Sequence, residues 1–536
     1  MKEPIRVAIA QINPLVGDVL GNTKKIIDYA IKARDQLHAR AVIFPEMALS
    51  GYPLYDLLLN NNIHVQIKNA LKEIKNTVKN IYIIIGYPEQ DKAKRYNSAI
   101  VIYNGEFIAN YRKQNLDSIE DQYFTPGNKV CVFKIHSHKM ALFICKDLWT
   151  TKPKPSFKKN QLDAIICINA SPFTITKAAL REKLLNQKAR ELKAPIIYAN
   201  CVGGQDDFIF DGESMLVNRQ GKIIKRAGFF NEELLLTELS SISSRPRKIN
   251  FKHNIESLIY QALVLSVRDY VEKNHFKGVV IGSSGGIDSA LTIAIAVDAL
   301  GKDRVATVFM PSCHTSDLSA EIVSSQSKIL KIKNYTIPIN NIFNCYINSL
   351  KDIFKELPED ITEENLQARC RGTLLMAISN KKKLLVLATG NKSELAMGYA
   401  TLYGDMAGGF CPLADLTKTL VYRLANYRNS ISLVISEDAI TREPSAELRP
   451  NQKDTDSLPP YAILDEIIVK YIEQGQSVEK IIAAGFEAAT VKKVIATIEL
   501  NEYKRRQAPI GPKITSGKDR KSPITKAIFQ DIKYQK

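Results

Sequence analysis

Residues 278–290 bring small, hydroxyl-bearing and acidic side chains together in one short segment. The segment reads Gly278-Val-Val-Ile-Gly-Ser-Ser-Gly-Gly-Ile-Asp-Ser-Ala290, which predicts a buried strand, a loop and a helix that begins near Asp288. A glycine-rich loop before a helix points backbone N–H groups outward, where they can bind phosphate oxygens. The carboxylate of Asp288 could hold a magnesium ion that bridges to the same phosphates. We expect a polyphosphate site here, and an ordinary glycine turn is the simpler alternative.

Three residues in the first half have the side chains that a thiol amidase needs. Glu46, Lys113 and Cys145 each lie just past the C-terminal end of a predicted strand. Sites in layered α/β proteins are built at such strand ends. Cys145 would be the nucleophile, Glu46 the base that takes its proton, and Lys113 the cation that stabilises the oxyanion and the thiolate. Each residue alone says little, because a lone cysteine usually belongs to the core.

A cysteine–histidine pair is the alternative arrangement for this thiol. His136 and His138 are close to Cys145 in the sequence, but they fall in the turn of its predicted hairpin. That turn lies at the far end of the strand that leads to the cysteine. We therefore favour the arrangement with Glu46 and Lys113.

Alternating strands and helices position these residues. A helix is predicted at 22–39, capped by Asn22 or Thr23, and strands are predicted at 5–12, 41–44, 81–85, 98–103, 106–111, 130–135, 140–144, 163–168 and 195–199. Asn104-Gly105 is a strong hairpin signal between two of these strands. Residues 240–254 are rich in serine and basic residues and read as a linker. We therefore expect two domains, 1–245 and 255–536.

The overall composition sets limits on the class of protein. A chain of 536 residues is too long for one hydrophobic core. The eight cysteines form no C-x-x-C pair, so we expect free thiols and a cytoplasmic location. No signal peptide is expected, and no apolar run approaches the ~20 residues that span a bilayer. The net charge of +18 leaves nucleic-acid binding as a second interpretation, although the basic residues are spread out.

The first half resembles the nitrilase superfamily. The similarity is carried by Phe44-Pro-Glu46, Tyr111-Arg-Lys113 and Ile144-Cys-Lys-Asp-Leu-Trp149. The resemblance implies a four-layer αββα sandwich whose Glu-Lys-Cys triad hydrolyses carbon–nitrogen bonds. It also implies that Ser171 and Lys177 hold glutamine, whereas by themselves they would read as a turn before a basic helix. The remaining candidates for glutamine binding are Glu120, which matches the superfamily's second glutamate, and Tyr123, in a loop shorter than the usual one.

The second half predicts a parallel, doubly wound α/β sheet. Helices are expected at 255–273, 317–330 and 365–380, and strands at 305–309, 335–337 and 384–388. This alternation is typical of parallel sheets with helices on both faces. The strands that end at Ile281 and Ala388 would then face the same ligand crevice.

The loop 284–289 is similar to the pyrophosphate loop of the ATP pyrophosphatase superfamily, which splits ATP into AMP and pyrophosphate. No G-x-x-x-x-G-K-[ST] occurs in the chain, so the mononucleotide P-loop is excluded. Further segments resemble the NAD⁺ synthetases: Met310-Pro-Ser312, Glu364-Asn-Leu-Gln-Ala-Arg369, Thr389-Gly-Asn-Lys-Ser-Glu394 and Leu402-Tyr-Gly-Asp-Met-Ala-Gly-Gly-Phe410. The fold class expected for this half is therefore the ATP pyrophosphatase type.

The resemblance assigns residues to each ligand. ATP would be bound by Gly282, Ser283, Ser284, Gly285, Gly286, Ile287, Asp288, Ser289 and Thr389. Deamido-NAD⁺ would be bound by Asn365, Glu394, Asp405, Lys418 and a C-terminal lysine, either Lys513 or Lys518. Magnesium would be held by Asp288 and Glu394.

Both halves together resemble the glutamine-dependent NAD⁺ synthetases over nearly the whole chain. The resemblance implies a carbon–nitrogen ligase that amidates deamido-NAD⁺ through an acyl-adenylate, with ammonia released from glutamine, giving AMP, diphosphate and glutamate. It implies Mg²⁺, ATP as co-substrate and a homo-oligomer, with no nucleic-acid or membrane partner. Two alternatives stay open: an ammonia-only synthetase whose first half is a scaffold, and a tRNA-binding or tRNA-modifying protein, since similar loops serve tRNA enzymes.

Overall fold

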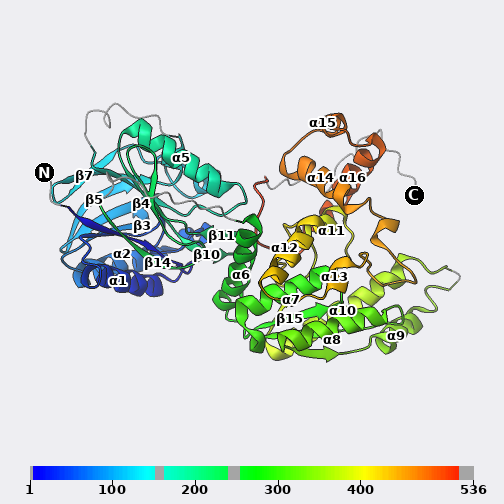
Figure 1. Cartoon of the computed structure of the whole chain (residues 1–536). Helices are drawn as coiled ribbons and strands as arrows, with labels where there is room; N and C mark the ends of the chain where they lie inside the picture. Colours follow the sequence, from blue (N-terminus) through cyan, green and yellow to red (C-terminus); the bar gives the residue numbers. More distant parts are fainter. Residues whose placement is uncertain (1–3, 151–161, 240–253, 356, 518–536) are drawn as a thin grey trace. The chain divides into compact units, whose positions relative to one another are not determined.

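The computed structural model describes residues 4–150, 162–239, 254–355 and 357–517 of the chain. It divides into two compact units, residues 1–253 and 254–536, which are coloured from blue to green and from green to red in Figure 1. Nearly all of the expected linker, residues 240–253, lies outside the described residues, and so does Lys518.

Two six-stranded sheets form the centre of the first unit. The first has the strand order β14-β1-β2-β3-β4-β5, and the second has the order β13-β12-β9-β8-β7-β6. The strands of the first sheet are β1 (Arg6–Gln11), β2 (Ala41–Ile43), β3 (Tyr82–Asp91), β4 (Lys94–Tyr103), β5 (Glu106–Arg112) and β14 (Glu233–Glu238). The strands of the second are β6 (Cys131–Ile135), β7 (His138–Ile144), β8 (Ala164–Asn169), β9 (Ile196–Asn200), β12 (Met215–Val217) and β13 (Ile223–Arg226).

Helices cover the outer faces of both sheets. In Figure 1, α1 (Val19–Asp35) and α2 (Asn61–Thr77) lie below the strands and α5 (Lys177–Leu192) lies above them. Neighbouring residues of a strand point to opposite faces, so Ile43 packs between the two sheets while Val42 packs under the helices. The central strands of each sheet are therefore buried on both faces. The predicted four-layer αββα sandwich is confirmed.

The first helix begins and ends earlier than the sequence indicated. It spans Val19–Asp35, and the side chain of Asp18 accepts a hydrogen bond from the N–H of Gly21 at 2.8 Å. The expected caps are wrong because Asn22 and Thr23 are buried inside the first turns. Asn22 binds the backbone of the preceding loop, and Thr23 donates to a carbonyl within the helix.

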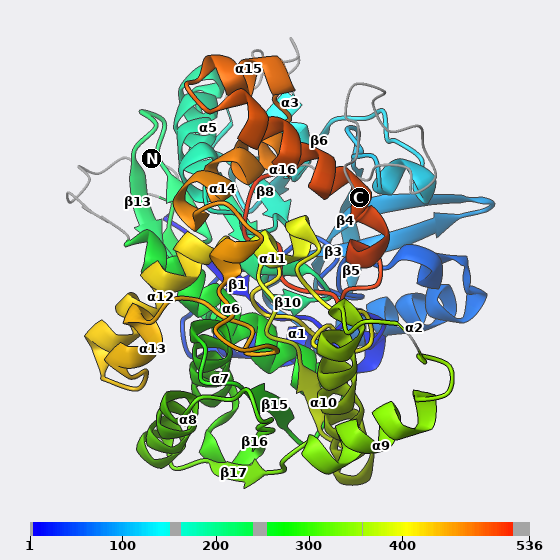
Figure 2. The same ribbon diagram turned by 90° about the vertical axis from the view of Figure 1, so that its right-hand side faces the viewer.

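The second unit is built on a parallel sheet of four strands. Their order is β17-β16-β15-β18, with bounds β15 (Val279–Ser283), β16 (Val305–Phe309), β17 (Lys333–Thr336) and β18 (Leu385–Leu387). Figure 2 shows α7 (Ile287–Leu300) and α8 (Asp317–Leu330) on one side of these strands, with α9 (Asn340–Leu350) and α10 (Ile361–Lys382) on the other. Because helices cover both faces, the predicted doubly wound sheet is confirmed.

The strand order reverses at β15. The chain runs from β15 outward through β16 and β17, then returns to place β18 on the other side of β15. Such a reversal leaves a crevice at the carboxyl ends of the two central strands, where ligands bind in folds of this class. The loops after Ser283 and Leu387 both start at this crevice.

Further helices complete the second unit. A separate core cluster joins α11 (Lys392–Met397), α14 (Tyr461–Ile468) and α16 (Ala488–Leu500). The other helices discussed below are α3 (Lys146–Thr150) of the first unit and α6 (Ile255–Lys273), α12 (Lys418–Ile431) and α17 (Glu502–Arg505) of the second. In the part of the chain that the structure describes, no helix is both long and apolar enough to cross a bilayer.

Gly86 of β3 offers a test of the first unit's packing. A Cβ atom at this position would lie 2.5 Å from the backbone N of Met47 and 2.7 Å from the Cα of Glu46. The backbone would have to move, so we expect Gly86→Ala to lower the free energy of unfolding of this unit by about 2–3 kcal/mol. Urea unfolding followed by the fluorescence of Trp149, the chain's single tryptophan, would measure the change.

Gly228→Ala is the matched control in the same unit. Its added Cβ would meet only the Oε2 atom of Glu233, at 3.6 Å. We expect a change below about 1 kcal/mol. Equal destabilisation by both substitutions would contradict the close approach at Gly86.

Candidate active sites

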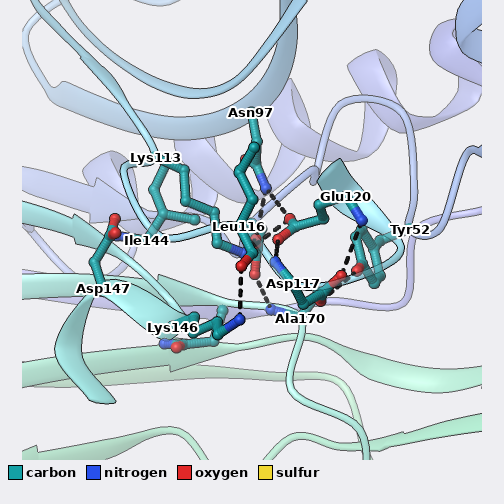
Figure 3. Close-up of polar contacts among 12 residues, drawn as sticks. Tyr52, Asn97, Lys113, Leu116, Asp117, Glu120, Ile144, Lys146, Asp147 and Ala170 are labelled. Carbon is teal, nitrogen blue, oxygen red and sulfur yellow. Dashed lines mark hydrogen bonds and ion pairs between the residues drawn. The ribbon is translucent and has the colours of Figure 1, made fainter. Parts of the chain in front are cut away.

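Four buried polar side chains meet in the first unit. Lys113 donates from Nζ to the Oε1 atoms of Glu46 and Glu120, each at 2.8 Å. The amide of Asn97 donates to the same two oxygens at 2.7 Å (Figure 3). All four residues are buried. The Lys113 ammonium and the two carboxyl groups therefore compensate one another in part, with Asn97 as a neutral donor, and buried ions are tolerated when they are paired in this way.

Cys145 follows β7 and lies beside this cluster. Its N–H donates to the carbonyl of Ile168 at 2.9 Å, which extends the pairing of β7 with β8 by one residue. Its backbone then takes a positive φ of 43°. Non-glycine residues rarely adopt this conformation, and those that do are often found at functional sites. The sharp change of direction before α3 leaves the thiol at the carboxyl edge of the second sheet.

Burial and neighbouring charges set the protonation of these groups. Burial and the Glu46 carboxylate raise the pKa of the Cys145 thiol to about 12, while Lys113 opposes the shift. Burial also raises the pKa of Glu120 to about 7, again against the effect of Lys113. The pKa of Lys113 would be lowered by burial alone, but the acids around it hold it well above its usual value. The thiol is therefore protonated at neutral pH and needs a base before it can attack.

Asp147 fastens the loop after Lys113. Its carboxylate accepts hydrogen bonds from the hydroxyl of Tyr111 at 2.8 Å and from the N–H groups of Gln114 and Asn115 at 3.1 and 2.8 Å. Since Asp147 itself lies in α3, these bonds connect the end of β5 to the helix that follows the cysteine. The two strand ends that carry the cation and the thiol are thus fixed to each other.

The expected glutamine-binding residues lie close to the same thiol. Lys177 is the first residue of α5, and its charge interacts with Cys145 although burial lowers its pKa. Its side chain makes no hydrogen bond or ion pair within the described ranges of the chain. Ser171 is buried directly after Ala170, whose N–H donates to Glu46 Oε2 at 2.8 Å. The structure therefore brings both residues to the cluster.

Tyr52 is a residue of this site that the sequence reasoning missed. Its hydroxyl donates to Asp117 at 3.5 Å, and burial followed by the charge of Glu120 raises its pKa well above the usual value (Figure 3). Its only signal is its position six residues after Glu46. The hydroxyl of Tyr123 instead donates to Asp56 at 2.8 Å. A role of Tyr123 in glutamine binding stays a prediction.

The alternative pairing of Cys145 with a histidine is wrong. His138 is the first residue of β7, whereas Cys145 follows its last residue. A strand of this length separates its two ends by roughly 20 Å. His136 lies in the turn before it and packs edge-on against Tyr82, with ring centroids 5.6 Å apart.

A second site lies at the crevice of the second unit. A cavity of about 380 Å³ is lined by the loop after β15, by α10 and by the segments 387–407 and 439–454. The expected ATP-binding residues that line it are Gly282, Ser283, Ser284, Gly286, Ile287, Asp288, Ser289 and Thr389. The expected dinucleotide-binding residues that line it are Asn365, Glu394, Asp405 and Lys418.

The loop after β15 has the shape of an anion-binding loop. Gly285 has a φ of 81°, and a Cβ there would lie 2.9 Å from the backbone of Ser319, so a larger residue does not fit. The hydroxyl of Ser284 accepts from the N–H of Gly286 at 3.2 Å, and that of Ser289 donates to the carbonyl of Gly286 at 3.0 Å. Gly286 precedes α7 without a side-chain cap. The loop therefore presents its backbone to the cavity at a helix N-terminus.

Lys418 lies between the two acids expected to serve magnesium. Its Nζ is 2.5 Å from Asp288 Oδ2 and 3.0 Å from Glu394 Oε1. Asn391 donates to the other oxygen of Asp288 at 2.9 Å. Burial raises the pKa of Glu394 to about 7, and Lys418 opposes that shift. One ammonium thus neutralises part of the acidic end of the cavity.

The cavity also contains cations that the sequence reasoning missed. Lys504 lines it and donates to the carbonyls of Gly398 and Ala400 at 2.8 and 2.9 Å. Lys504 was visible in the sequence only as the first residue of a basic cluster. Arg371 lines it as well. Lys513 does not line it, so its contact with a dinucleotide stays a prediction.

Comparison with known proteins assigns a family to each half of the chain. The carbon-nitrogen hydrolase family model matches residues 6–247, and the NAD synthase model matches residues 259–508. The class of protein is therefore a carbon–nitrogen hydrolase domain joined to an NAD synthase domain.

Full-length relatives define the family more closely. The glutamine-dependent NAD(+) synthetase of Acinetobacter baylyi is 44% identical over 97% of this chain and 98% of its own, and that of Aquifex aeolicus is 40% identical over 98% and 100%. The structure of the Acinetobacter baumannii enzyme in complex with ADP is 42% identical, covers 97% of this chain and 98% of its own, and superposes with a TM-score of 0.80. The chain belongs to the glutamine-dependent NAD⁺ synthetase family.

The raised pKa of Cys145 predicts an unusual alkylation profile. Below a pKa of about 12 the thiolate fraction rises about tenfold for each pH unit. The rate of reaction of Cys145 with iodoacetamide should therefore keep rising from pH 7 to pH 10. Peptide mass spectrometry would follow it, with the exposed Cys313 and Cys345 read in the same digest to check delivery of the reagent. A plateau at Cys145 below pH 9 would contradict the electrostatic picture.

Proposed function

We propose that this chain makes NAD⁺ by amidating deamido-NAD⁺, with ATP as the activating co-substrate and glutamine as the nitrogen source. The observation that supports it most is that one chain combines a buried Glu46–Lys113 pair beside a cysteine with a loop-lined nucleotide cavity. A carboxylate is a poor electrophile, so ATP must first convert it to an acyl-adenylate. Free ammonia is mostly protonated at neutral pH, so a local source of NH₃ has a clear chemical purpose.

The first unit releases ammonia from glutamine in this proposal. Glu46 takes the proton of the Cys145 thiol as sulfur attacks the side-chain amide carbon. Lys113 stabilises the negative charge that develops on the amide oxygen. The proton on Glu46 passes to the leaving nitrogen, NH₃ departs, and a thioester remains on sulfur. Water activated by Glu46 then hydrolyses the thioester, which yields glutamate and restores the thiol.

Lys177 and Ser171 hold the amino-acid end of glutamine. Lys177 carries a half-buried ammonium, and the α-carboxylate of glutamine is the complementary charge. Ser171 offers a hydroxyl near the α-amino group. Glu120 keeps Lys113 oriented through its hydrogen bond at 2.8 Å.

The second unit activates and amidates the dinucleotide. The backbone of 282–286 and the hydroxyls of Ser284 and Ser289 bind the phosphates of ATP, with Thr389 just after the carboxyl end of the neighbouring parallel strand β18. Asn365, Asp405 and Lys418 bind deamido-NAD⁺ in the same cavity. The nicotinate carboxylate attacks the α-phosphorus, diphosphate leaves, and NH₃ then displaces AMP to form the amide.

Asp288 and Glu394 fit a magnesium ion that is shared with ATP. Mg²⁺ commonly takes one or two carboxylates together with substrate phosphates. Within the described segments no group of three or more His, Cys, Asp or Glu could hold a metal, so ATP would supply the remaining ligands. When bound, the ion would neutralise charge on the departing diphosphate.

We also infer the setting in which the enzyme works. All eight cysteines are free thiols, which favours the reducing cytoplasm. Exposed apolar side chains such as Leu20, Leu57 and Leu59 favour association into a homo-oligomer.

Cys145→Ala tests the assignment of the first unit. We expect NAD⁺ formation with glutamine to fall about a thousandfold or more, because no thioester can form. The rate with ammonium should stay within twofold of wild type. Chromatographic measurement of NAD⁺ from deamido-NAD⁺, ATP and Mg²⁺ with each donor would check this. A mutant that still uses glutamine would overturn the assignment, and a wild type that uses ammonium alone would make the first unit a scaffold.

Asp288→Asn tests the assignment of the second unit. The charge that faces ATP and magnesium is lost while the size is kept, so we expect the NAD⁺-forming rate to fall about a hundredfold with both donors. Asp298→Asn, a substitution on the same helix at an ion pair with Arg428, is the control and should keep most of the rate. Equal loss with both variants would point to a folding defect.

A further inference from the structure

A buried network of charges lies behind the glutamine-binding residues of the first unit. Arg181 of α5 is completely buried and donates from Nη2 to both carboxylate oxygens of Asp211 at 3.0 Å. Its Nη1 donates to Glu213 at 2.9 Å. Replacing a buried ion pair by apolar side chains is often neutral or stabilising. Stability alone therefore does not explain why these charges are buried here.

Asn200 connects this network to Ser171. The residue ends β9 and is completely buried. Its Oδ1 accepts from the N–H of Ser171 at 2.9 Å, and its Nδ2 donates to the carbonyl of Ser171 at 3.3 Å. The same Nδ2 donates to Asp211 Oδ1 at 3.1 Å and to the carbonyl of Gly212 at 2.9 Å. The side-chain amide of Asn200 is thus hydrogen-bonded to Asp211 and Gly212 and also to both the N–H and the carbonyl of Ser171.

The same network also reaches Lys177. Arg181 lies four residues after Lys177 on α5, so both side chains project from one face of the helix. The charges of Arg181 and Asp211 both act on the Lys177 ammonium, in opposite directions. The ion pair therefore fixes the helix turn that carries Lys177, and through Asn200 it fixes the strand end that carries Ser171.

We propose that Asn200 and the Arg181–Asp211 pair are positioning residues that set the spacing between Ser171 and Lys177, and thereby select an α-amino acid as the amide donor. This inference rests on the proposed glutaminase function. The two groups that recognise the α-amino and α-carboxylate ends come from different elements, the end of β8 and the start of α5. Their separation must match a small zwitterion, and a rigid buried connection provides that match.

The inference separates substrate recognition from the chemistry at sulfur. In the part of the chain that the structure describes, the side chains of Asn200 and Arg181 make no hydrogen bond to Glu46, Lys113 or Cys145. Loosening the network should therefore weaken the hold on glutamine much more than it changes the reactivity of the thiol, on which Lys177 acts more weakly than Glu46 and Lys113. A role in general stability would affect both.

The test compares Asn200→Ala and Asp211→Asn with wild type in the full-length enzyme, by glutamate release with deamido-NAD⁺, ATP and Mg²⁺ present. We expect the KM for glutamine to rise about tenfold or more, as for the loss of one buried hydrogen bond, with a smaller change in kcat. The preference for glutamine over L-glutamine amide, whose α-carboxylate is capped, should fall. The alkylation rate of Cys145 by iodoacetamide should stay within twofold.

Asn218→Ala is the matched control. Asn218 is a buried asparagine of the same unit whose Oδ1 accepts from the N–H groups of Gln220 and Lys222 in a distant turn. The Asn218→Ala substitution should lower thermal stability without raising the KM for glutamine. Three outcomes would overturn this inference but not the proposed function. They are a KM within twofold of wild type in both test variants, an equal rise of the KM in the control, and a Cys145 alkylation rate that falls in step with kcat/KM. A wild type that releases no glutamate would instead overturn the proposed function, and the inference with it.

Discussion

The ammonium of Lys113, held between Glu46 and Glu120, is the interaction on which the first unit depends. A buried charge that loses a partner typically costs about 3–5 kcal/mol, so all three groups must be placed together. The four layers make this possible because they exclude water from the carboxyl edges of both sheets. Asn97 and Asp147 then fix the orientation of the cluster and of the loop next to it. The packing of the layers and the ion pairs therefore depend on each other. Looser packing would let water reach the ions, and an ion without its partner would destabilise the packed layers.

The second unit has a different requirement from the first, because it must accept a highly charged ligand. Its cavity is lined by both polar and apolar side chains, and its acids are shared with Lys418 and not sealed in a closed cluster. A loop that uses backbone N–H groups to bind phosphate does not depend on side-chain protonation, so its affinity is insensitive to small pH changes. The two halves thus differ physically: the first buries charged side chains, and the second presents a glycine-rich loop at a helix N-terminus.

Much of the fold and several residues of the first site could be predicted from the sequence, and the reason differs from one element to another. The positions of Glu46, Lys113 and Cys145 followed from strand ends, because apolar runs are a strong local signal. The fold class followed from the same alternation. By contrast, the partner of Glu46 at Asn97 lies 51 residues away, and the contact depends on how two β-strands pair in space. No local pattern marks such a residue.

Lys504 and the start of α1 show two other limits of sequence reasoning. Lys504 is one of many lysines near the C-terminus, and only the folded chain shows which of them faces the cavity. The helix start was misplaced because Asp18, Asn22 and Thr23 are all good capping residues. Which of them caps is decided by the loop that Asn22 anchors from inside.

Each described hydrophobic core cluster belongs wholly to one of the two units. A substitution that loosens one of these cores is therefore expected to act first on its own unit. In evolutionary terms, such a chain can be assembled by joining two genes whose products already folded. Each half can then accumulate changes at its own pace.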